Sequence, residues 1–173
     1  MALDERRDDQ LLFSVDIVGV SRLRRGLRGE HHGGPDRDFV DLVDRQTFEI
    51  GPLRITPHLV NHPVEAYGLR VEADGAVLAY TGDTDACPAL VELERDADLV
   101  LTDSAFVDGR DDEMRGVHLS GSRAAQTAKD AGAKRLMLTH IPTWTPVEDC
   151  LRDARTVWEG DVEVAVAGET YEL

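Results

Sequence analysis

Three strand-like runs in this chain each end shortly before a residue that can bind a metal ion or transfer a proton. These residues are His62 after the run 53–60, Asp83 after the run 76–80, and His140 after the run 136–138. In open α/β architectures, ligands and catalytic groups collect at strand ends and in the loops that follow them. A fourth candidate, His118, comes directly before an Ala-rich helical stretch. The pattern favours a sheet-based fold and predicts a shared polar site at the strand ends.

The stretch around Asp83 constrains the chemistry of that site most. It reads Ala79-Tyr80-Thr81-Gly82-Asp83-Thr84, so a glycine and then a carboxylate follow a buried strand. Each oxygen of a carboxylate can serve one of two divalent cations, and two such metals can clamp an in-line displacement at phosphorus. The alternative interpretation is an Asp-Thr turn that closes the strand.

From Phe39 onward, turn residues separate short runs with strand or helix patterns. The predicted strands are 46–50, 53–60, 67–73, 76–81, 99–102, 135–139, 162–167 and 170–172. Asp74-Gly75, between two of these strands, is a strong hairpin signal. Because a meander of strands comes first and helices then alternate with strands, we predict an α/β fold with a mixed sheet and helices on at least one face.

Three helices are predicted from capping residues and apolar spacing. Pro88 suits the first turn of one helix, and Ser120 can cap a second helix that ends at Gly132. For the third, Thr145-Pro146-Val147-Glu148 combines a capping box with a proline at the first helical position. The apolar faces expected to be buried are Leu90, Leu93 and Ala97; Ala124, Ala128 and Ala131; and Val147, Leu151, Ala154 and Trp158.

The N-terminal part of the chain reads differently from the rest. We treat residues 1–35 as an unassigned segment and residues 36–173 as one domain. The segment holds an apolar run at 11–20, which periodicity assigns to neither strand nor helix. His31 and His32 are adjacent, and neighbours in a strand face opposite sides, so they cannot chelate as a His-x-His pair does. We interpret them as loop residues.

Charge and cysteine content narrow the classes of function. The formal net charge is −15, so the chain repels polyanions at long range, and a large nucleic acid is a poor candidate substrate. No signal peptide is visible and no apolar run reaches membrane-spanning length, so we expect a cytoplasmic protein with no membrane partner. In that compartment Cys87 and Cys150 are expected to be free thiols.

Each candidate site residue also has a structural interpretation. His62 and His140 can be hydrogen-bonded residues that hold strand ends, and His118 can be a surface residue that contacts its loop. As a site residue, His118 can donate a proton to a leaving group. His62, Asp83 and His140 are three protein ligands, the number that a catalytic zinc uses together with a water.

Four neighbouring residues have two interpretations each. Thr84 and Asp85 can orient the metal ligands, or they can cap the following helix. Tyr67 and Trp144 can line a pocket, or they can belong to the core or its rim.

Four motifs in order carry a resemblance to a known family. They are Asn61-His62-Pro63-Val64-Glu65-Ala66-Tyr67-Gly68-Leu69-Arg70-Val71, Tyr80-Thr81-Gly82-Asp83-Thr84, His118-Leu119-Ser120 and Leu138-Thr139-His140-Ile141-Pro142. Together they resemble the successive motifs of the metallo-β-lactamase superfamily. The branch they resemble is ribonuclease Z-like, and especially the small actinobacterial hydrolases regarded as cyclic-nucleotide phosphodiesterases.

The resemblance implies a four-layer αββα sandwich, of which this chain would form mainly the C-terminal half. It also implies a dinuclear zinc site at the sheet edges, in which His62 ligates one Zn²⁺, His140 ligates the other and Asp83 bridges them. His118 would protonate the leaving oxygen, so His118 and Asp83 are the expected catalytic residues. The implied substrate is a small phosphodiester such as a cyclic nucleotide, and a second copy of the chain, in a homodimer, is a candidate partner.

The sequence departs from the family pattern upstream of His62. The family's His-x-His-x-Asp-His motif, which supplies two ligands to each zinc, is absent. Asp103-Ser104 stands where relatives carry an acidic residue before a small one, and its role stays open. We therefore expect a truncated zinc-dependent hydrolase with little or no activity in this form. The alternatives are a hydrolase resembling the tRNA 3′-processing endonuclease, and a degenerate, non-catalytic binding module.

Overall fold

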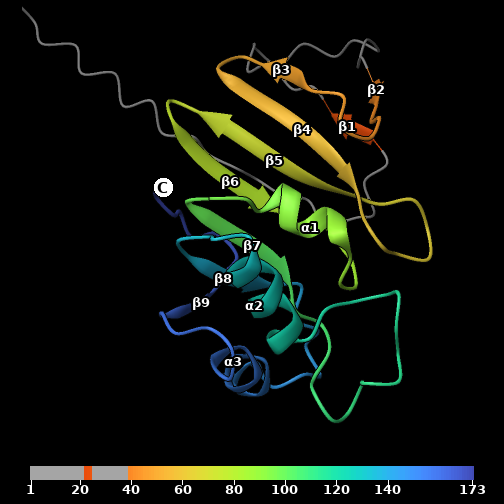
Figure 1. Cartoon of the computed structure of the whole chain (residues 1–173), viewed down its shortest axis with the longest axis vertical. Helices are drawn as coiled ribbons and strands as arrows, with labels where there is room; N and C mark the ends of the chain where they lie inside the picture. The colour runs from red at the N-terminus through yellow and green to blue at the C-terminus, as the bar shows by residue number, and fades with distance from the viewer. Residues whose placement is uncertain (1–21, 25–38) are drawn as a thin grey trace, which may run out of the picture.

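The computed structural model describes residues 22–24 and 39–173, and its main element is a seven-stranded mixed sheet (Figure 1). In sheet order its strands are β3 (Phe48–Ile50), β4 (Leu53–Leu59), β5 (Tyr67–Ala73), β6 (Ala76–Tyr80), β7 (Leu99–Asp103), β8 (Leu136–Thr139) and β9 (Val162–Val164). Pairing is antiparallel from β3 to β6 and parallel from β6 to β9. A separate antiparallel pair joins β1 (Arg22–Arg24) to β2 (Phe39–Asp41). The predicted mixed sheet with an initial meander is confirmed.

The turn between β5 and β6 shows how local sequence sets the register of the meander. Asp74 and Gly75 have φ of 52° and 85°. Positive φ at both central residues is what a type I′ turn requires, and such a turn matches the twist of its flanking strands. Ala73 therefore pairs directly with Ala76, as the Asp-Gly signal predicts.

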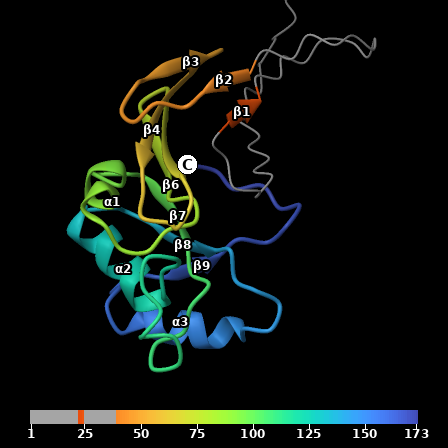
Figure 2. The same cartoon turned by 90° about the vertical axis from the view of Figure 1, so that its right-hand side faces the viewer.

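Helices α1 (Pro88–Leu93), α2 (Gly121–Asp130) and α3 (Val147–Arg155) follow the meander. Helix α1 packs on β4 and β5, and α2 packs on β7 and β8 as well as on both other helices. Figures 1 and 2 show α1 and α2 on the same side of the sheet. The main core on this side combines helix residues with every second strand residue, including Leu90, Leu93, Ala124, Ala128, Ala79, Val100, Leu136 and Leu138.

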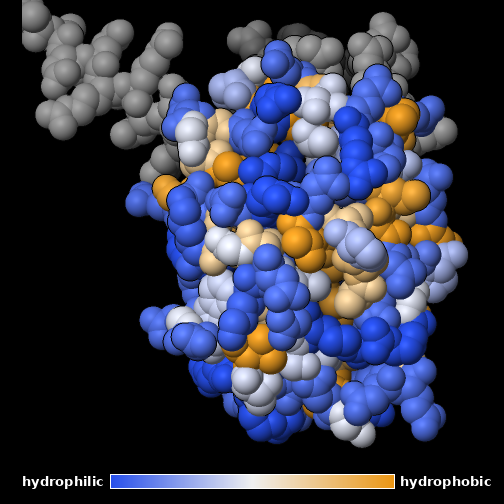
Figure 3. Space-filling model, viewed as in Figure 1, coloured by the Kyte–Doolittle hydropathy of each residue, from blue (hydrophilic) through white to orange (hydrophobic). Residues whose placement is uncertain are grey.

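The opposite side of the sheet carries a smaller apolar cluster. Its buried members are Ile55, Val71, Leu78, Leu99 and Met137. These residues alternate with those of the main core, because successive side chains of a strand point to opposite faces. Tyr171 packs against this cluster, and Figure 2 shows the C-terminal segment on the side away from α1 and α2. On the helix-bearing side, Figure 3 shows a mostly hydrophilic surface with small hydrophobic patches.

The prediction for the two C-terminal strands is partly wrong. Residues 170–172 do not form a strand, and β9 ends at Val164 instead of residue 167. After β9 the chain turns at Gly168, whose φ is 87°. Tyr171 then reaches back, and its hydroxyl accepts a hydrogen bond from Val166 N at 2.9 Å. A side-chain contact therefore replaces the strand pairing that the apolar pattern favours.

The predicted helix faces are largely confirmed. Leu90, Leu93, Ala97, Ala124, Ala128 and Ala131 are all buried. In α3, Ala154 is buried, whereas Val147 and Leu151 are only half-buried. Trp158 is also half-buried, but it packs on the main core from beyond the end of the helix.

The predicted caps are only partly correct. Ser120 is the N-cap of α2 but makes no side-chain capping hydrogen bond. The N-cap of α3 is Pro146, not Thr145, and it also lacks a side-chain bond. The Thr145 hydroxyl instead accepts a hydrogen bond from Arg110 at 3.2 Å. A contact between two loops has therefore taken the oxygen that the capping box needs.

Some predictions concern residues that the structure does not describe. Apart from β1, the segment 1–35 lies outside the described residues, and so do the run 11–20, His31 and His32. Cys87 and Cys150 are free, as predicted. In the described part of the chain, no helix is long and apolar enough to cross a bilayer.

Candidate metal and catalytic site

The four predicted site residues lie together at one edge of the sheet. His62, Asp83 and His140 follow β4, β6 and β8, and these strands run in the same direction, so their carboxyl ends share that edge. The ring centroid of His118 is 5.7 Å from that of His62 and 5.0 Å from that of His140. Asp83 Oδ1 is 3.6 Å from His140 Nδ1. We call these four residues the strand-end cluster; the fold brings them together, and their chemical roles stay predictions.

Gly82 and His140 have left-handed backbone conformations at the strand-end cluster. Gly82 has a φ of 64°, and a Cβ at this position would lie 2.7 Å from the carbonyl oxygen of Tyr67, so a larger residue would collide with β5. His140 has a φ of 57°, a left-handed conformation that few residues with a side chain adopt. Such conformations are concentrated at functional sites, where the surrounding structure enforces them.

His118 is held by a buried carboxylate. Its Nδ1 donates to Asp103 Oδ2 at 2.7 Å, and Asp103 lies at the end of β7 with 1% of its surface exposed. The hydrogen bond to Asp103 raises the pKa of His118 above its usual value, although burial of the ring opposes that rise. Phe106 packs edge-on against the imidazole, with ring centroids 5.2 Å apart. Asp103 therefore orients His118 and favours its protonated form.

The sequence left the role of Asp103 open. Asp103, like Asp83, is a carboxylate at the end of a short buried strand, so the same sequence pattern could have identified it. Its partner His118 is 15 residues away in the sequence. Local spacing therefore gives no indication that the two side chains meet.

Asp85 connects the cluster to the acidic loop 108–116. Its carboxylate accepts hydrogen bonds from Gly116 N and Arg115 Nε, both at 2.8 Å, and from Arg123 Nη1 at 2.7 Å. Burial raises the pKa of Asp85, but these bonds outweigh it and the pKa is lowered. Asp85 does not cap α1, whose N-cap is Cys87. It acts as a structural tie behind the cluster.

The described residues by themselves do not form a closed metal site. Among them, no three His, Cys, Asp or Glu side chains lie close enough to hold one ion. His118 uses Nδ1 for Asp103, and His62 Nδ1 is buried without a hydrogen-bond partner. The ligand set predicted for zinc is therefore not completed by His62, Asp83 and His140 alone, and we derive no reaction step through a metal.

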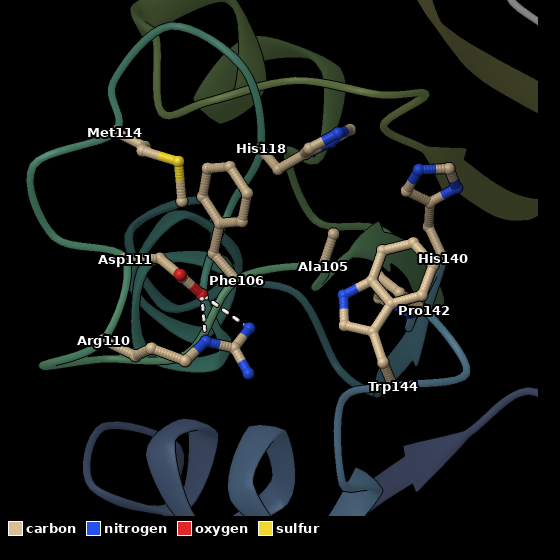
Figure 4. Close-up of a pocket in the computed structure, with 9 residues that line it drawn as sticks. All are labelled: Ala105, Phe106, Arg110, Asp111, Met114, His118, His140, Pro142 and Trp144. Carbon is tan, nitrogen blue, oxygen red and sulfur yellow. Dashed lines mark hydrogen bonds and ion pairs between the residues drawn. The ribbon is translucent and has the colours of Figure 1, made fainter.

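A pocket of about 390 Å³ opens beside the cluster (Figure 4). Its lining residues are Ala105, Phe106, Arg110, Asp111, Met114, His118, His140, Pro142 and Trp144. The volume lies within the roughly 300–1,000 Å³ typical of small-molecule sites. Trp144 belongs to this lining, as one sequence interpretation proposed, whereas Tyr67 does not.

Fold and site together define an α/β protein with a mixed sheet and a cluster of polar residues at the carboxyl ends of its strands. A family model for the beta-lactamase superfamily domain matches residues 5–141. The chain belongs to this family, the metallo-β-lactamase superfamily, as its four motifs predict. The matched residues include most of the segment 1–35.

Relatives with known sequences or structures agree with this assignment. The protein ML1173 of Mycobacterium leprae is 40% identical over 158 residues, 87% of this chain and 55% of that protein. For YhfI of Bacillus subtilis, a metallo-beta-lactamase fold protein, identity is 32% over 127 residues, 73% of this chain and 52% of YhfI. The crystal structure of YhfI matches with a TM-score of 0.71 at 29% identity, over 76% of this chain and 54% of that chain. The ribonuclease Z of Myxococcus xanthus is 43% identical over 104 residues, 57% of this chain and 33% of the enzyme.

The lengths of these relatives bear on function. The chain spans about half the length of ML1173 and of YhfI.

Proposed function

We propose that this chain carries part of the active site of a zinc-dependent hydrolase that cleaves phosphodiester bonds in small substrates such as cyclic nucleotides. The observation that carries the proposal is the hydrogen-bonded pair of Asp103 and His118, set beside Asp83 and His140. Buried carboxylates that hold a histidine by one nitrogen leave the other nitrogen for a substrate.

The pair is suited to proton donation. With Nδ1 bound to Asp103, the Nε2 atom of His118 is the one left to give a proton to the leaving oxygen of a phosphodiester. The raised pKa of His118 keeps that proton in place at higher pH than for a free histidine. In this proposal His62, Asp83 and His140 contribute metal ligands to a centre whose remaining ligands lie outside the described residues.

Two other functions compete with this proposal. A tRNA 3′-processing activity is favoured by the likeness to a ribonuclease Z, but the net charge of −15 opposes binding of a polyanion. A non-catalytic binding module is favoured by the incomplete ligand set of the described residues.

The test is hydrolysis of bis(4-nitrophenyl) phosphate, cyclic AMP and a precursor tRNA in the presence of zinc. It compares this chain with a version to which upstream sequence carrying His-x-His-x-Asp-His is joined. We expect turnover of the two small substrates by the longer version, its loss with a chelator, and little turnover by this chain. In the longer version, Asp83→Ala or His118→Ala should lower kcat by at least about 100-fold, while Glu159→Ala, which alters an exposed side chain, should not.

Three outcomes would count against the proposal. Absence of turnover in the longer version would favour the binding module, and cleavage of tRNA without hydrolysis of cyclic AMP would favour the ribonuclease. Equal, chelator-sensitive turnover by this chain alone would show that the upstream motif is dispensable.

A further inference from the structure

Two large apolar side chains are exposed on the rim of the pocket beside the strand-end cluster. Trp144 exposes 79% of its surface and Met114 exposes 47%. Single exposed apolar residues are common, but a group of them at the mouth of a pocket marks a binding surface. The two residues come from loops far apart in the chain, so the tertiary structure creates this surface.

The walls of the pocket are aromatic and face each other. Figure 4 shows Trp144 on one side of the cavity and Phe106 and Met114 on the other, with His118 and His140 along one edge. A flat apolar group between two such walls would lie next to both histidines. Aromatic walls bind planar rings through large contact area and favourable ring–ring geometry.

The wall that contains Phe106 is already rigid. Phe106 N donates to Leu119 O at 3.0 Å, and its ring rests on His118. Below the ring, Asp111 accepts hydrogen bonds from Val107 N at 2.9 Å and from Arg110 Nε at 2.9 Å. This wall therefore needs little ordering when a ligand binds, which favours affinity.

Arg110 links the two walls and adds a polar end to the pocket. Its Nη2 donates to the hydroxyl of Thr145, the residue after Trp144, at 3.2 Å. Arg110 and Asp111 are the charged lining residues away from the histidines. A planar ring with nitrogen or oxygen atoms on its edge would find a donor and an acceptor at this end.

We propose that this pocket binds the planar ring of the substrate, a nucleobase or a ring of similar chemistry, and that Trp144 and Phe106 determine this specificity. The proposal rests on the proposed function, because it places the phosphodiester on the histidine side of the pocket. Stacking is the expected source of discrimination, since a sugar phosphate without a base has no flat apolar surface to offer. The ring binds whether or not a metal is present.

Binding is tested by the fluorescence of Trp144 in a Trp158→Phe variant, which leaves one tryptophan in the chain. The probes are adenosine 5′-monophosphate and ribose 5-phosphate, each without added metal. We expect saturable quenching by the nucleotide and none by the sugar phosphate. Phe106→Ala should weaken nucleotide binding by about fivefold or more, and Val43→Ala, an exposed apolar control, should leave it unchanged.

A second measurement keeps the result independent of the fluorophore. Calorimetry on the otherwise unchanged chain should show the same fivefold or larger loss for Trp144→Ala, whose exposed side chain contributes little to the fold. Equal binding of the two probes, or unchanged affinity in Phe106→Ala and Trp144→Ala, would overturn the proposal. Base binding that persists where the hydrolysis test fails would support the pocket and refute only the activity.

Discussion

At the scale of single residues, the site depends on one buried carboxylate that the motif pattern does not emphasise. Besides His118, Asp103 accepts hydrogen bonds from Thr84 N at 3.1 Å and from Ala105 N at 3.0 Å. It thereby joins the loop after β6 to the loop after β7. A buried donor that loses its acceptor costs more free energy than an average hydrogen bond contributes.

We expect Asp103→Ala to destabilise the protein by about 2–4 kcal/mol, because two buried N–H groups and one histidine lose their acceptor. Asp103→Asn keeps the shape and one oxygen, and its loss should be about half as large. Urea unfolding followed by circular dichroism measures both free energies. Similar stability in wild type and Asp103→Ala would show that the carboxylate is not a structural tie.

Glu94 is a second buried carboxyl group, and no step of the proposed chemistry uses it. It has no exposed surface, its Oε1 lies 3.3 Å from the hydroxyl oxygen of Thr127, and its Oε2 has no hydrogen-bond partner among the described residues. Burial raises the pKa of Glu94 from 4.5 to about 8. The folded protein therefore holds a proton on Glu94 at neutral pH that the unfolded chain releases.

The consequence is a stability that falls as pH rises from about 4.5 to about 8, because the folded state binds the extra proton in that window. Between pH 5.5 and pH 8, the free energy of unfolding of wild type should fall by about 2–4 kcal/mol. Glu94→Gln should not show this decrease. The measurement is urea unfolding at both pH values. Parallel pH profiles for wild type and Glu94→Gln would contradict the assignment.

At the scale of elements, the contact between α2 and α3 depends on a glycine. A Cβ at Gly121 would overlap the carbonyl oxygen of Cys150 and lie 2.9 Å from Ala154 N. The first turn of α2 therefore packs directly on the backbone of α3. His118 and Ser120 precede α2; the His118 side chain bonds to Asp103 at the end of β7, and Ser120 forms a β-bridge with Phe106.

Gly121→Ala should separate the two helices and destabilise the protein by about 1–3 kcal/mol, the usual cost of overpacking. Thermal unfolding measures the effect. Gln126→Ala is the control, because this residue is exposed on α2 and its side-chain amide donates a hydrogen bond to Asp130, one turn along the same helix. A variant as stable as wild type would mean that α3 can move away freely.

At the scale of the whole molecule, the question is whether the chain holds a metal as part of its fold. An ion that binds only the folded state stabilises that state by mass action. Among the described residues no three ligands lie together, so we expect these residues by themselves to gain little folding stability from a metal ion.

We therefore expect the melting temperature of this chain to change by less than about 2 °C when zinc is removed with EDTA, since little binding free energy is lost. Differential scanning calorimetry with and without the chelator makes the comparison. A large decrease with EDTA would show that residues outside the described ones complete a structural metal centre.

The sequence by itself determined the features that a few neighbouring residues encode. The β5–β6 turn follows from Asp74-Gly75, because both residues tolerate positive φ. The strand-end positions of His62, Asp83 and His140 follow from apolar runs that stop shortly before them. The family followed from four such motifs in order.

Only the tertiary structure decided which of these residues meet. Strand pairing puts Asp103 at the edge of the sheet, where the loop before α2 places His118 beside it, and the contact of Arg110 with Thr145 joins two loops beside the pocket. The same contact removes the hydroxyl that sequence assigned to the α3 cap. The physical reason is that strand pairing and loop packing bring together side chains that are distant in the sequence. Local sequence propensity does not depend on these long-range contacts, so it cannot predict them.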